Sequence, residues 1–376
     1  MRRAMSRRLP LTSVTTPLSS TEVRTSVPLN RHTTLRLGGP AARFLPATSA
    51  ADVVDAVRAA DQAGEPLLVL GGGSNLVIAD DGFAGLVVHI ATKGRSFDRL
   101  ADGRVELTIE AGEDWDRTVA FSVEQGLGGL ECLSGIPGQV GATPVQNVGA
   151  YGVEIADMLT SVDLLDRRNG RVHQVQAEDL GLTYRSSVLK GTDSAVVLRA
   201  RFALQDGGQS APIRYAELAR VLGVELGARV PVADARAAVL ELRRGKGMVL
   251  EVDDHDTWSA GSFFTNPIVE NAELPAVLAK IIERVGPDAT VPQYPGGPER
   301  TKLSAAWLIE RAGFGKGHAA ADGRVSLSGK HTLALTNRGD ASTADLLELA
   351  REVRDGVLTA FGVRLQAEPV MVGCRL

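Results

Sequence analysis

The chain has 376 residues and a formal net charge of −4, and 44% of its residues are hydrophobic, 23% charged and 4% aromatic. This length and composition predict a globular protein of two or three domains with ample core. The negative charge and the few aromatic rings argue against broad nucleic-acid binding and base stacking, and no apolar run approaches the roughly 18 residues of a membrane span.

Residues 1–24 are predicted to form a disordered tail. Arginines and then a Ser/Thr-rich run follow the initiator methionine, without the apolar segment that a signal peptide requires. So polar a segment cannot bury enough apolar surface to order itself.

The first regular elements alternate between helix and strand. A helix is expected to begin at Ser49, with Asp52 as its capping partner, and to end at Gly64. Strands are expected at residues 67–70, 76–78, 86–90 and 104–109, followed by a helix over 115–125.

The turn at residues 71–75, GGGSN, follows the buried strand 67–70 directly. Its glycines allow backbone amides to turn toward an anion such as a diphosphate, although glycine-rich turns also follow strands for purely topological reasons. The dinucleotide fingerprint of a Rossmann domain does not fit, because a strand rather than a helix comes next.

A second glycine-rich stretch covers residues 127–152 and contains no lysine or arginine. Such a backbone can lie flat against a ligand, and two stretches of this kind together predict a large nucleotide cofactor. Strands follow at 162–165, 172–175 and 195–204, with Tyr184 and Arg185 on an exposed loop between the last two. Strands and helices without a regular βαβ repeat predict an α+β fold.

The last third of the chain begins with a helix over 232–244, which ends in cations up to Lys246. These cations complement the helix dipole, and they would also suit a diphosphate substrate. A Pro/Gly-rich loop is expected at 292–300, helices at 302–312 and 342–362, and a final strand containing Glu368.

Several chemistries are disfavoured by the sequence. The segment around Ser262 lacks the second glycine of a hydrolase nucleophile turn. Cys132 and Cys374 have neither disulfide-framework nor zinc-site spacing, and Cys132 is interpreted as a buried structural residue rather than a catalytic thiol. The acidic run 253–256 is expected to be a solvated turn, so no metal is predicted. Two unpaired cysteines are typical of a reducing cytoplasm, which is the expected location.

Five segments, in this order, resemble those of the UDP-N-acetylenolpyruvoylglucosamine reductases, the flavoenzymes of peptidoglycan precursor synthesis. The segments are residues 71–78, 136–152, 184–187, 260–267 and 365–369. The resemblance runs from about residue 29 to the C-terminus.

The resemblance implies a two-lobed FAD-binding fold of the vanillyl-alcohol-oxidase type and a C-terminal α+β substrate-binding domain. The lobes would be residues 25–90 and 91–230, with the terminal strand 363–376 returning to the first lobe. The UDP-sugar domain would be residues 231–362, and a monomer is expected.

The implied reaction is reduction of the enolpyruvyl ether of UDP-N-acetylglucosamine to UDP-N-acetylmuramate, with NADPH as reductant and noncovalent FAD as hydride carrier. Arg185 and Glu368 would stabilise the charge on the substrate carboxylate, and Ser262 would deliver a proton. Another FAD-dependent sugar or alcohol oxidase on the same scaffold, and a nucleotide-binding module without activity, remain as alternatives.

The resemblance also implies binding residues. The FAD-binding positions are Gly71, Gly72, Gly73, Ser74, Asn75, Pro137, Gly138, Gly141, Ala142, Gln146, Asn147, Gly149, Ala150, Tyr151 and Gly152. The UDP-sugar positions are Tyr184, Tyr215, Lys246 and Asn266, with Tyr215 on the loop of the family's longer type. The segment around Lys246 departs from the family's K-x-P pattern.

Overall fold

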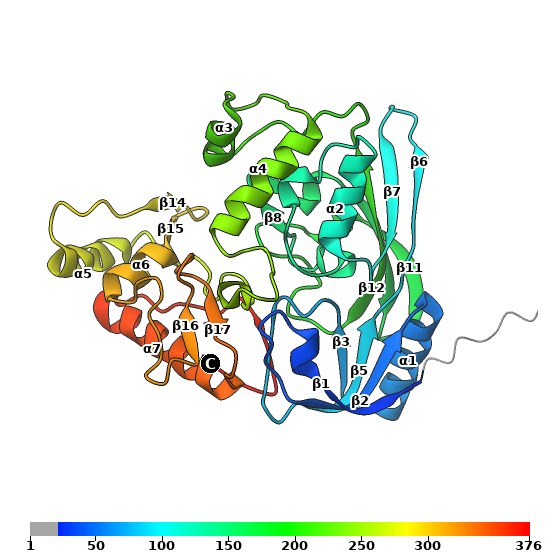
Figure 1. Ribbon diagram of the computed structural model, residues 1–376, viewed down its shortest axis with the longest axis horizontal. Helices are drawn as coiled ribbons and strands as arrows, with labels where there is room; N and C mark the ends of the chain where they lie inside the picture. The colour runs from blue at the N-terminus through cyan, green and yellow to red at the C-terminus, as the bar shows by residue number, and fades with distance from the viewer. Residues whose placement is uncertain (1–21) are drawn as a thin grey trace, which may run out of the picture.

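The computed structural model describes residues 22–376 and places two sheets on one side of the molecule and a smaller α+β part on the other (Figure 1). The first sheet has the order β1-β2-β5-β3, with β2, β5 and β3 parallel to one another. Its strands are β1 (Arg24–Pro28), β2 (Pro40–Ala47), β3 (Leu67–Leu70) and β5 (Phe83–Ile90). Helix α1 (Ala50–Ala63) packs against this sheet.

The second sheet is antiparallel throughout and has the order β11-β10-β12-β7-β6. Its strands are β6 (Arg95–Arg99), β7 (Val105–Glu110), β10 (Leu159–Asp166), β11 (Arg171–Gln176) and β12 (Ala195–Leu204). Buried and half-buried side chains alternate along β7, as expected for a strand with one face in the core. Helix α2 (Trp115–Glu124) lies beside it, α4 (Val232–Gly245) packs against α2, and α3 (Ala216–Leu222) packs against α4.

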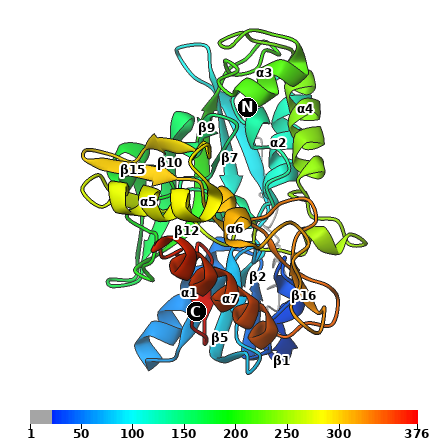
Figure 2. The ribbon, with the colours of Figure 1, turned by 90° about the vertical axis from the view of Figure 1, so that its left-hand side faces the viewer.

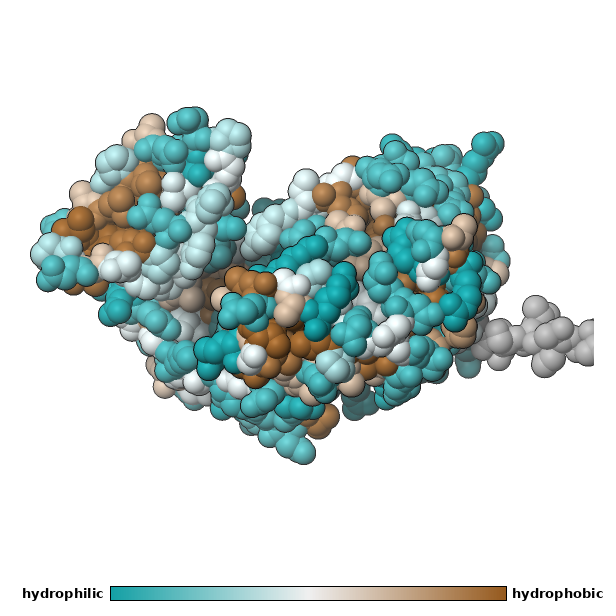
Figure 3. All heavy atoms as spheres, turned by 90° about the horizontal axis from the view of Figure 1, so that it is seen from above, coloured by the Kyte–Doolittle hydropathy of each residue, from teal (hydrophilic) through white to brown (hydrophobic). Residues whose placement is uncertain are grey.

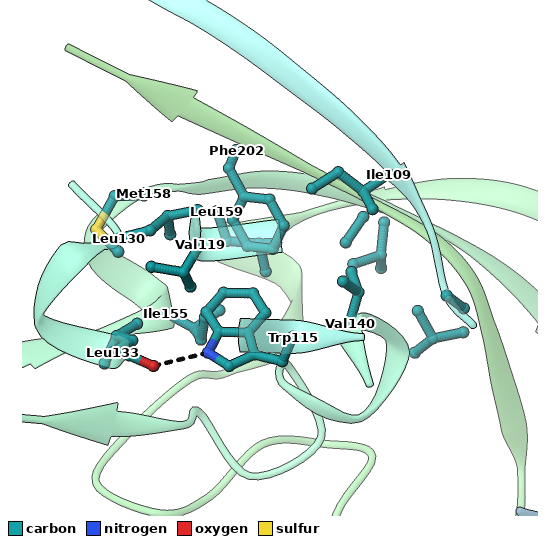
Figure 4. Packing of buried hydrophobic residues seen from close by; sticks show 14 of the residues in the cluster. Ile109, Trp115, Val119, Leu130, Leu133, Val140, Ile155, Met158, Leu159 and Phe202 are labelled. Atoms are coloured by element: carbon teal, nitrogen blue, oxygen red, sulfur yellow. Dashed lines mark hydrogen bonds between the residues drawn. The ribbon is translucent and has the colours of Figure 1, made fainter. Parts of the chain in front are cut away.

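Trp115, the first residue of α2, is at the centre of the core beneath the second sheet (Figure 4). Its ring is fully buried and meets Phe202 edge-on, with the ring centroids 5.8 Å apart. The indole N–H donates a hydrogen bond to the carbonyl of Leu133 at 3.0 Å. A large apolar side chain thus fills the core while its one polar atom fixes the neighbouring loop.

The C-terminal part has its own core, and its helices face the viewer in Figure 2. The helices are α5 (Leu274–Val285), α6 (Ala305–Ala312) and α7 (Thr343–Phe361). The strands are β13 (Ile268–Glu270), β14 (Gln293–Pro295), β15 (Arg300–Leu303), β16 (Val325–Leu327) and β17 (Leu335–Asn337). Buried residues recur along α7 at helical spacing, from Leu346 to Val357.

Short elements complete the chain. The paired strands are β8 (Gly149–Ala150) with β9 (Val153–Glu154), and β4 (Leu76–Ile78) with β18 (Val370–Val372). The 3-10 helices are η1 (Leu29–His32), η2 (Glu131–Leu133), η3 (Val140–Ala142), η4 (Ile155–Asp157), η5 (Ala177–Leu180) and η6 (His255–Thr257). Ile78 of β4 and Val372 of β18 pack in one small core with residues of the first sheet, so the end of the chain returns beside that sheet.

Helix ends were predicted well because their signals are local. Ser49 and Ser342 form capping boxes with Asp52 and Asp345, and Gly64 and Gly362 end their helices in left-handed geometry. These predictions are confirmed.

Other boundaries were wrong because distant pairing decides them. Residues 302–303, predicted as helix, end strand β15 because Lys302 pairs with Ile268, and the helix starts only after Ser304. The loop predicted at 292–300 contains β14, which pairs with β15. Glu368 precedes the last strand instead of lying in it.

Three further differences concern the predicted tail and the helices α3, α4 and α5. The predicted tail lies outside the described residues except for its last three positions, of which Arg24 already begins β1. Helices α3 and α5 were not predicted. Helix α4, placed by the sequence in the third region, buries Ala235 and Val239 in the core of the sheets.

The N-terminus of α7 is capped by the segment around the end of β4. The carboxylate of Asp80, after β4, accepts hydrogen bonds from the amides of Thr343 at 2.7 Å and Ala344 at 3.0 Å. Thr343 donates its hydroxyl to the carbonyl of Ile78 at 2.6 Å. These bonds join the C-terminal core to β4, which packs beside the first sheet.

Replacing Asp80 by alanine should lower the free energy of unfolding by about 1–2 kcal/mol, because two helix-end amides lose an anionic acceptor. Urea denaturation followed by circular dichroism measures the change. Asp81→Ala is the matched control, since the Asp81 side chain is exposed and accepts no hydrogen bond from any described residue. Equal losses in the two variants would contradict the capping role.

Candidate active site

A cavity of about 410 Å³ lies where the two sheets and the C-terminal part meet. Seen from above, the molecule is hollowed between the lobe that carries α5 and the rest of the chain (Figure 3). The cavity is lined by residues 71–76, 136–139, 142–143, 145–146, 148–149, 247–248, 257 and 259–262, and by Val69, Trp115, Arg185, Arg243, Leu250, Glu368 and Val370.

The turn 71–75 faces this cavity with unused backbone donors. Among the described residues, none of its five amide N–H groups donates a hydrogen bond. Gly73 has a left-handed φ of 60°, and a Cβ there would lie 2.0 Å from the carbonyl oxygen of His32. Only glycine fits this position, and the result is a cluster of free amides of the kind that binds anions.

The two glycine-rich stretches touch each other at their backbones. A Cβ added to Gly72 would lie 2.7 Å from the Cα of Gly138. The Asn75 side chain donates to the Gln146 side chain across the junction at 3.2 Å. The stretches therefore form one continuous surface on the cavity wall.

Trp115 fixes the second stretch at two points. Its indole N–H binds the carbonyl of Leu133, and its backbone N–H binds the carbonyl of Gly138 at 3.0 Å. The intervening residues Ile136 and Pro137 line the cavity. A loop with few side chains of its own to pack is thus held by the core beneath it.

The wall fits a dinucleotide with a flat ring. It combines free amides for a diphosphate with apolar side chains such as Val69, Ile136 and Val148. Two buried polar atoms on it, Gln139 Oε1 and Arg243 Nε, have no hydrogen-bond partner among the described residues. Buried polar atoms are rarely left unpaired, so the two unpaired atoms indicate that a polar ligand binds here.

The three predicted catalytic residues converge at the same cavity. Arg185, Ser262 and Glu368 all line the cavity although they are far apart in sequence. The backbone of Phe263 explains part of this convergence: its N–H donates to the carbonyl of Leu333 at 2.7 Å, and its carbonyl accepts from the N–H of Glu368 at 2.9 Å.

Arg185 is held by the glycine-rich stretch. It has a left-handed φ of 53°, which is uncommon for a residue with a side chain. Its guanidinium donates to the carbonyl of Gly149 at 2.6 Å. The carbonyl of Arg185 accepts a hydrogen bond from the Lys190 ammonium at 2.7 Å. The side chain is thereby directed into the cavity.

Glu368 is a half-buried carboxyl group without a cation within 4.0 Å among the described residues. Burial raises its pKa, while the more distant Arg185 and Lys190 oppose the shift. A carboxyl with a raised pKa holds a proton more readily and can donate a hydrogen bond to an anion.

The predicted UDP-sugar residues lie outside the cavity wall and make contacts within the protein. The Lys302 ammonium lies 4.5 Å from the ring centre of Tyr184. Tyr215 meets Tyr151 edge-on with the ring centroids 5.4 Å apart. Lys246 forms an ion pair with Glu217 at 2.7 Å, and Asn266 Oδ1 accepts from the amide of Ala305 at 2.9 Å.

Some predicted cofactor residues also lie off the cavity wall. They are Gly141, Asn147, Ala150, Tyr151 and Gly152. The Asn147 side chain is fully buried and donates to Glu154 at 2.7 Å and to the carbonyl of Thr183 at 3.0 Å. In this structure Asn147 joins the glycine-rich stretch to the loop of Arg185.

Sequence reasoning missed the contributions of Trp115, Gln139 and Arg243. Arg243 was interpreted as one of the cations that end α4 and that would suit either the helix dipole or a diphosphate substrate, but it was not named as a site residue. Its burial lowers its pKa, yet a guanidinium keeps its charge, and it forms no ion pair with a described carboxylate. Only the structure reveals that this cation lies on the cavity wall.

Two carboxylates of the acidic run 253–256 are paired with cations. Asp254 binds Lys330, and Asp256 binds Arg338 at 2.7 Å. Over residues 22–376, no group of three or more His, Cys, Asp or Glu side chains is arranged to hold a metal. Burial raises the pKa of Cys132 to about 12, so this thiol is poorly suited to be a nucleophile.

Comparisons with known proteins agree with this geometry. A family model described as "FAD binding domain" matches residues 40–176, and one described as "UDP-N-acetylenolpyruvoylglucosamine reductase, C-terminal domain" matches residues 253–372. The predicted fold class, an FAD-binding fold with a C-terminal α+β domain, is confirmed.

Curated relatives match over nearly the full chain. The UDP-N-acetylenolpyruvoylglucosamine reductase of Saccharopolyspora erythraea is 71% identical over 93% of this chain and 95% of its own. That of Thermobifida fusca is 54% identical over 95% of this chain and 100% of its own. The crystal structure of the Thermus caldophilus reductase superposes with a TM-score of 0.61 at 25% identity, covering 93% of this chain and 98% of that one. No helix within the described residues is long and apolar enough to cross a membrane.

Replacing Gly72 by alanine should weaken FAD binding at least about tenfold, because the new methyl group would meet the backbone of Gly138, which cannot move aside cheaply. Titration of the stripped protein with FAD, followed by flavin fluorescence, measures the dissociation constant. Gly315→Ala is the matched control, since a Cβ there meets no heavy atom within 4 Å. Unchanged FAD affinity in Gly72→Ala would mean that the contact between the two turns is not required.

Proposed function

This chain belongs to the UDP-N-acetylenolpyruvoylglucosamine reductase family, and we propose that it reduces the enolpyruvyl ether of UDP-N-acetylglucosamine to UDP-N-acetylmuramate for peptidoglycan synthesis. The observation that carries the proposal is that Arg185, Ser262 and Glu368 line the same cavity as the free backbone amides of residues 71–75. FAD bound at that wall supplies hydride transfer, from NADPH to the enolpyruvyl double bond.

The cofactor would be held mainly by the backbone. The amides of residues 71–75 would bind its diphosphate, and the stretch 136–149 would lie along its ring. Gln139 Oε1 and the buried Arg243 Nε are available to polar atoms of the ligand.

Side chains of the protein would stabilise the negative charge and donate the proton. Hydride arriving at the β carbon of the enolpyruvyl group pushes negative charge into its carboxylate. Arg185 as a cation, and Glu368 as a hydrogen-bond donor, would stabilise that charge. Ser262 would then give its hydroxyl proton to the α carbon.

The UDP-sugar would be bound by Tyr184, Tyr215, Lys246 and Asn266. In this structure these groups contact partners within the protein, and the ion pair of Lys246 with Glu217 would have to give way for the lysine to reach a phosphate. A lysine paired at a half-exposed site can be released at little cost.

The division into lobes at residues 25–90, 91–230 and 231–362 is also part of the proposal. The packing of α4 on the sheets favours placing the last boundary after residue 245. We further propose that the protein acts as a monomer in the cytoplasm.

Anaerobic spectroscopy tests the function. NADPH should bleach the yellow FAD of the purified protein, and the enolpyruvyl ether of UDP-N-acetylglucosamine should then restore the colour without oxygen. Restoration by oxygen but not by this nucleotide would support the alternative, a sugar or alcohol oxidase.

Ser262→Ala should leave FAD binding and reduction by NADPH intact, while reoxidation by the sugar nucleotide slows by at least about two orders of magnitude, the usual scale of general acid catalysis. Ser262→Cys should retain more activity, because a thiol can donate a proton from nearly the same place. Rapid mixing of each half-reaction measures both rates, and reoxidation of the alanine variant within threefold of wild type would remove Ser262 from the mechanism.

A further inference from the structure

His331 lies next to Ser262 without lining the cavity. Its Nε2 is 3.5 Å from the Ser262 hydroxyl oxygen. Among the described residues this is the only side-chain hydrogen-bond partner of that hydroxyl. The Ser262 hydroxyl therefore faces the cavity, where the substrate would lie, on one side. On its other side, the protein side, it faces the imidazole of His331.

The position of this imidazole is set by backbone hydrogen bonds. The N–H of Phe263 donates to the carbonyl of Leu333 at 2.7 Å, which fixes the serine's segment beside the turn after β16. Within that turn the N–H of His331 donates to Ser328 Oγ at 3.3 Å, and its carbonyl accepts from Ala334 at 3.0 Å. Serine and histidine, which are 69 positions apart in the sequence, are thus brought together by a defined contact.

The imidazole is neutral at physiological pH. Burial lowers the pKa of His331 to about 4. The charged groups around it are Lys246, Lys316, Arg243 and Glu310, of which only the glutamate opposes the shift. A neutral ring carries one N–H and one acceptor nitrogen, and Nδ1 makes no hydrogen bond within the described part of the chain.

The chemistry of Ser262 requires a donor on its protein side. A serine that gives its proton to the substrate is left with negative charge on Oγ, in a site from which water is largely removed. A hydrogen bond to a developing oxyanion is considerably stronger than one to a neutral hydroxyl. A donor there also keeps the hydroxyl hydrogen free to point at the substrate.

We propose that His331 is a positioning residue that donates its Nε2–H to Ser262 Oγ, orients the hydroxyl hydrogen toward the substrate and stabilises the charge left when that proton moves to the α carbon. Oγ regains a proton from water as product leaves. The inference rests on the proposed role of Ser262. The distance of 3.5 Å is that of the protein without substrate, where such contacts are often longer than in the reacting complex.

His331→Leu and His331→Gln separate the donor from the bulk of the side chain. Leucine fills the space without donating, and should slow reoxidation by the sugar nucleotide about tenfold to a hundredfold. Glutamine can place an amide N–H near the position of Nε2 and should stay within about threefold of wild type, as a conservative replacement that keeps the bond. NADPH reduction and sugar-nucleotide binding should be unchanged in both. Rapid mixing and substrate titration give these values.

A double-mutant cycle distinguishes positioning of Ser262 from general packing. In a Ser262→Ala background, His331→Leu should cost nothing further, because the hydroxyl it serves is gone. His318→Leu is the control: His318 belongs to the same part of the chain but pairs with Glu352, and its replacement should leave both half-reactions unchanged.

Three results would overturn the inference. They are wild-type reoxidation in His331→Leu, a glutamine variant as slow as the leucine variant, and an undiminished leucine effect in the Ser262→Ala background. Failure of the wild-type protein to be reoxidised by the sugar nucleotide would instead reject the proposed function, so the two failures are separate.

Discussion

The backbone of Phe263 is the constraint on which the proposed catalytic site depends. Its N–H and its carbonyl are hydrogen-bonded to Leu333 on one side and to Glu368 on the other. Phe263 is itself buried in the C-terminal core, so this small ladder cannot slide without disturbing the packing. Since Ser262 precedes it, one well-packed residue aligns three segments that each bring a side chain of the proposed mechanism: the serine, Glu368 and His331.

The glycine-rich part of the cavity wall is built in the reverse way, from residues that have no side chains. The contact between Gly72 and Gly138 is closer than any Cβ would allow, and the amides of the first turn remain free because nothing else approaches them. Glycine weakens local structure, since it adds conformational entropy to the unfolded chain. Here the compensation comes from Trp115, whose buried ring and two hydrogen bonds hold the second stretch from below.

A structural feature could be predicted from the sequence where nearby residues determine it, and could not be predicted where contacts between distant residues determine it. The helix that is capped by Ser342 was predicted because its capping residues lie within one turn of its start. The glycine turn 71–75 was predicted from its own composition. Lys302 was assigned to a helix because only its distant pairing with Ile268 makes it a strand. The family motifs brought Ser262 and Glu368 to attention. No local pattern links Ser262 to His331, because that contact exists only once the C-terminal core has closed.

The site lies between separate cores because it contains polar groups whose burial lowers the stability of the fold. A buried guanidinium atom without a partner, as in Arg243, and a half-buried carboxyl without a nearby cation, as in Glu368, both oppose folding. Neither would be tolerated at the centre of a core, where every neighbour is apolar. At the junction of the sheets and the C-terminal part, the apolar packing around Trp115 on one side and along α7 on the other provides the stability. The junction can then leave polar groups unpaired, and such groups bind and polarise a charged substrate more strongly than groups already satisfied by the protein.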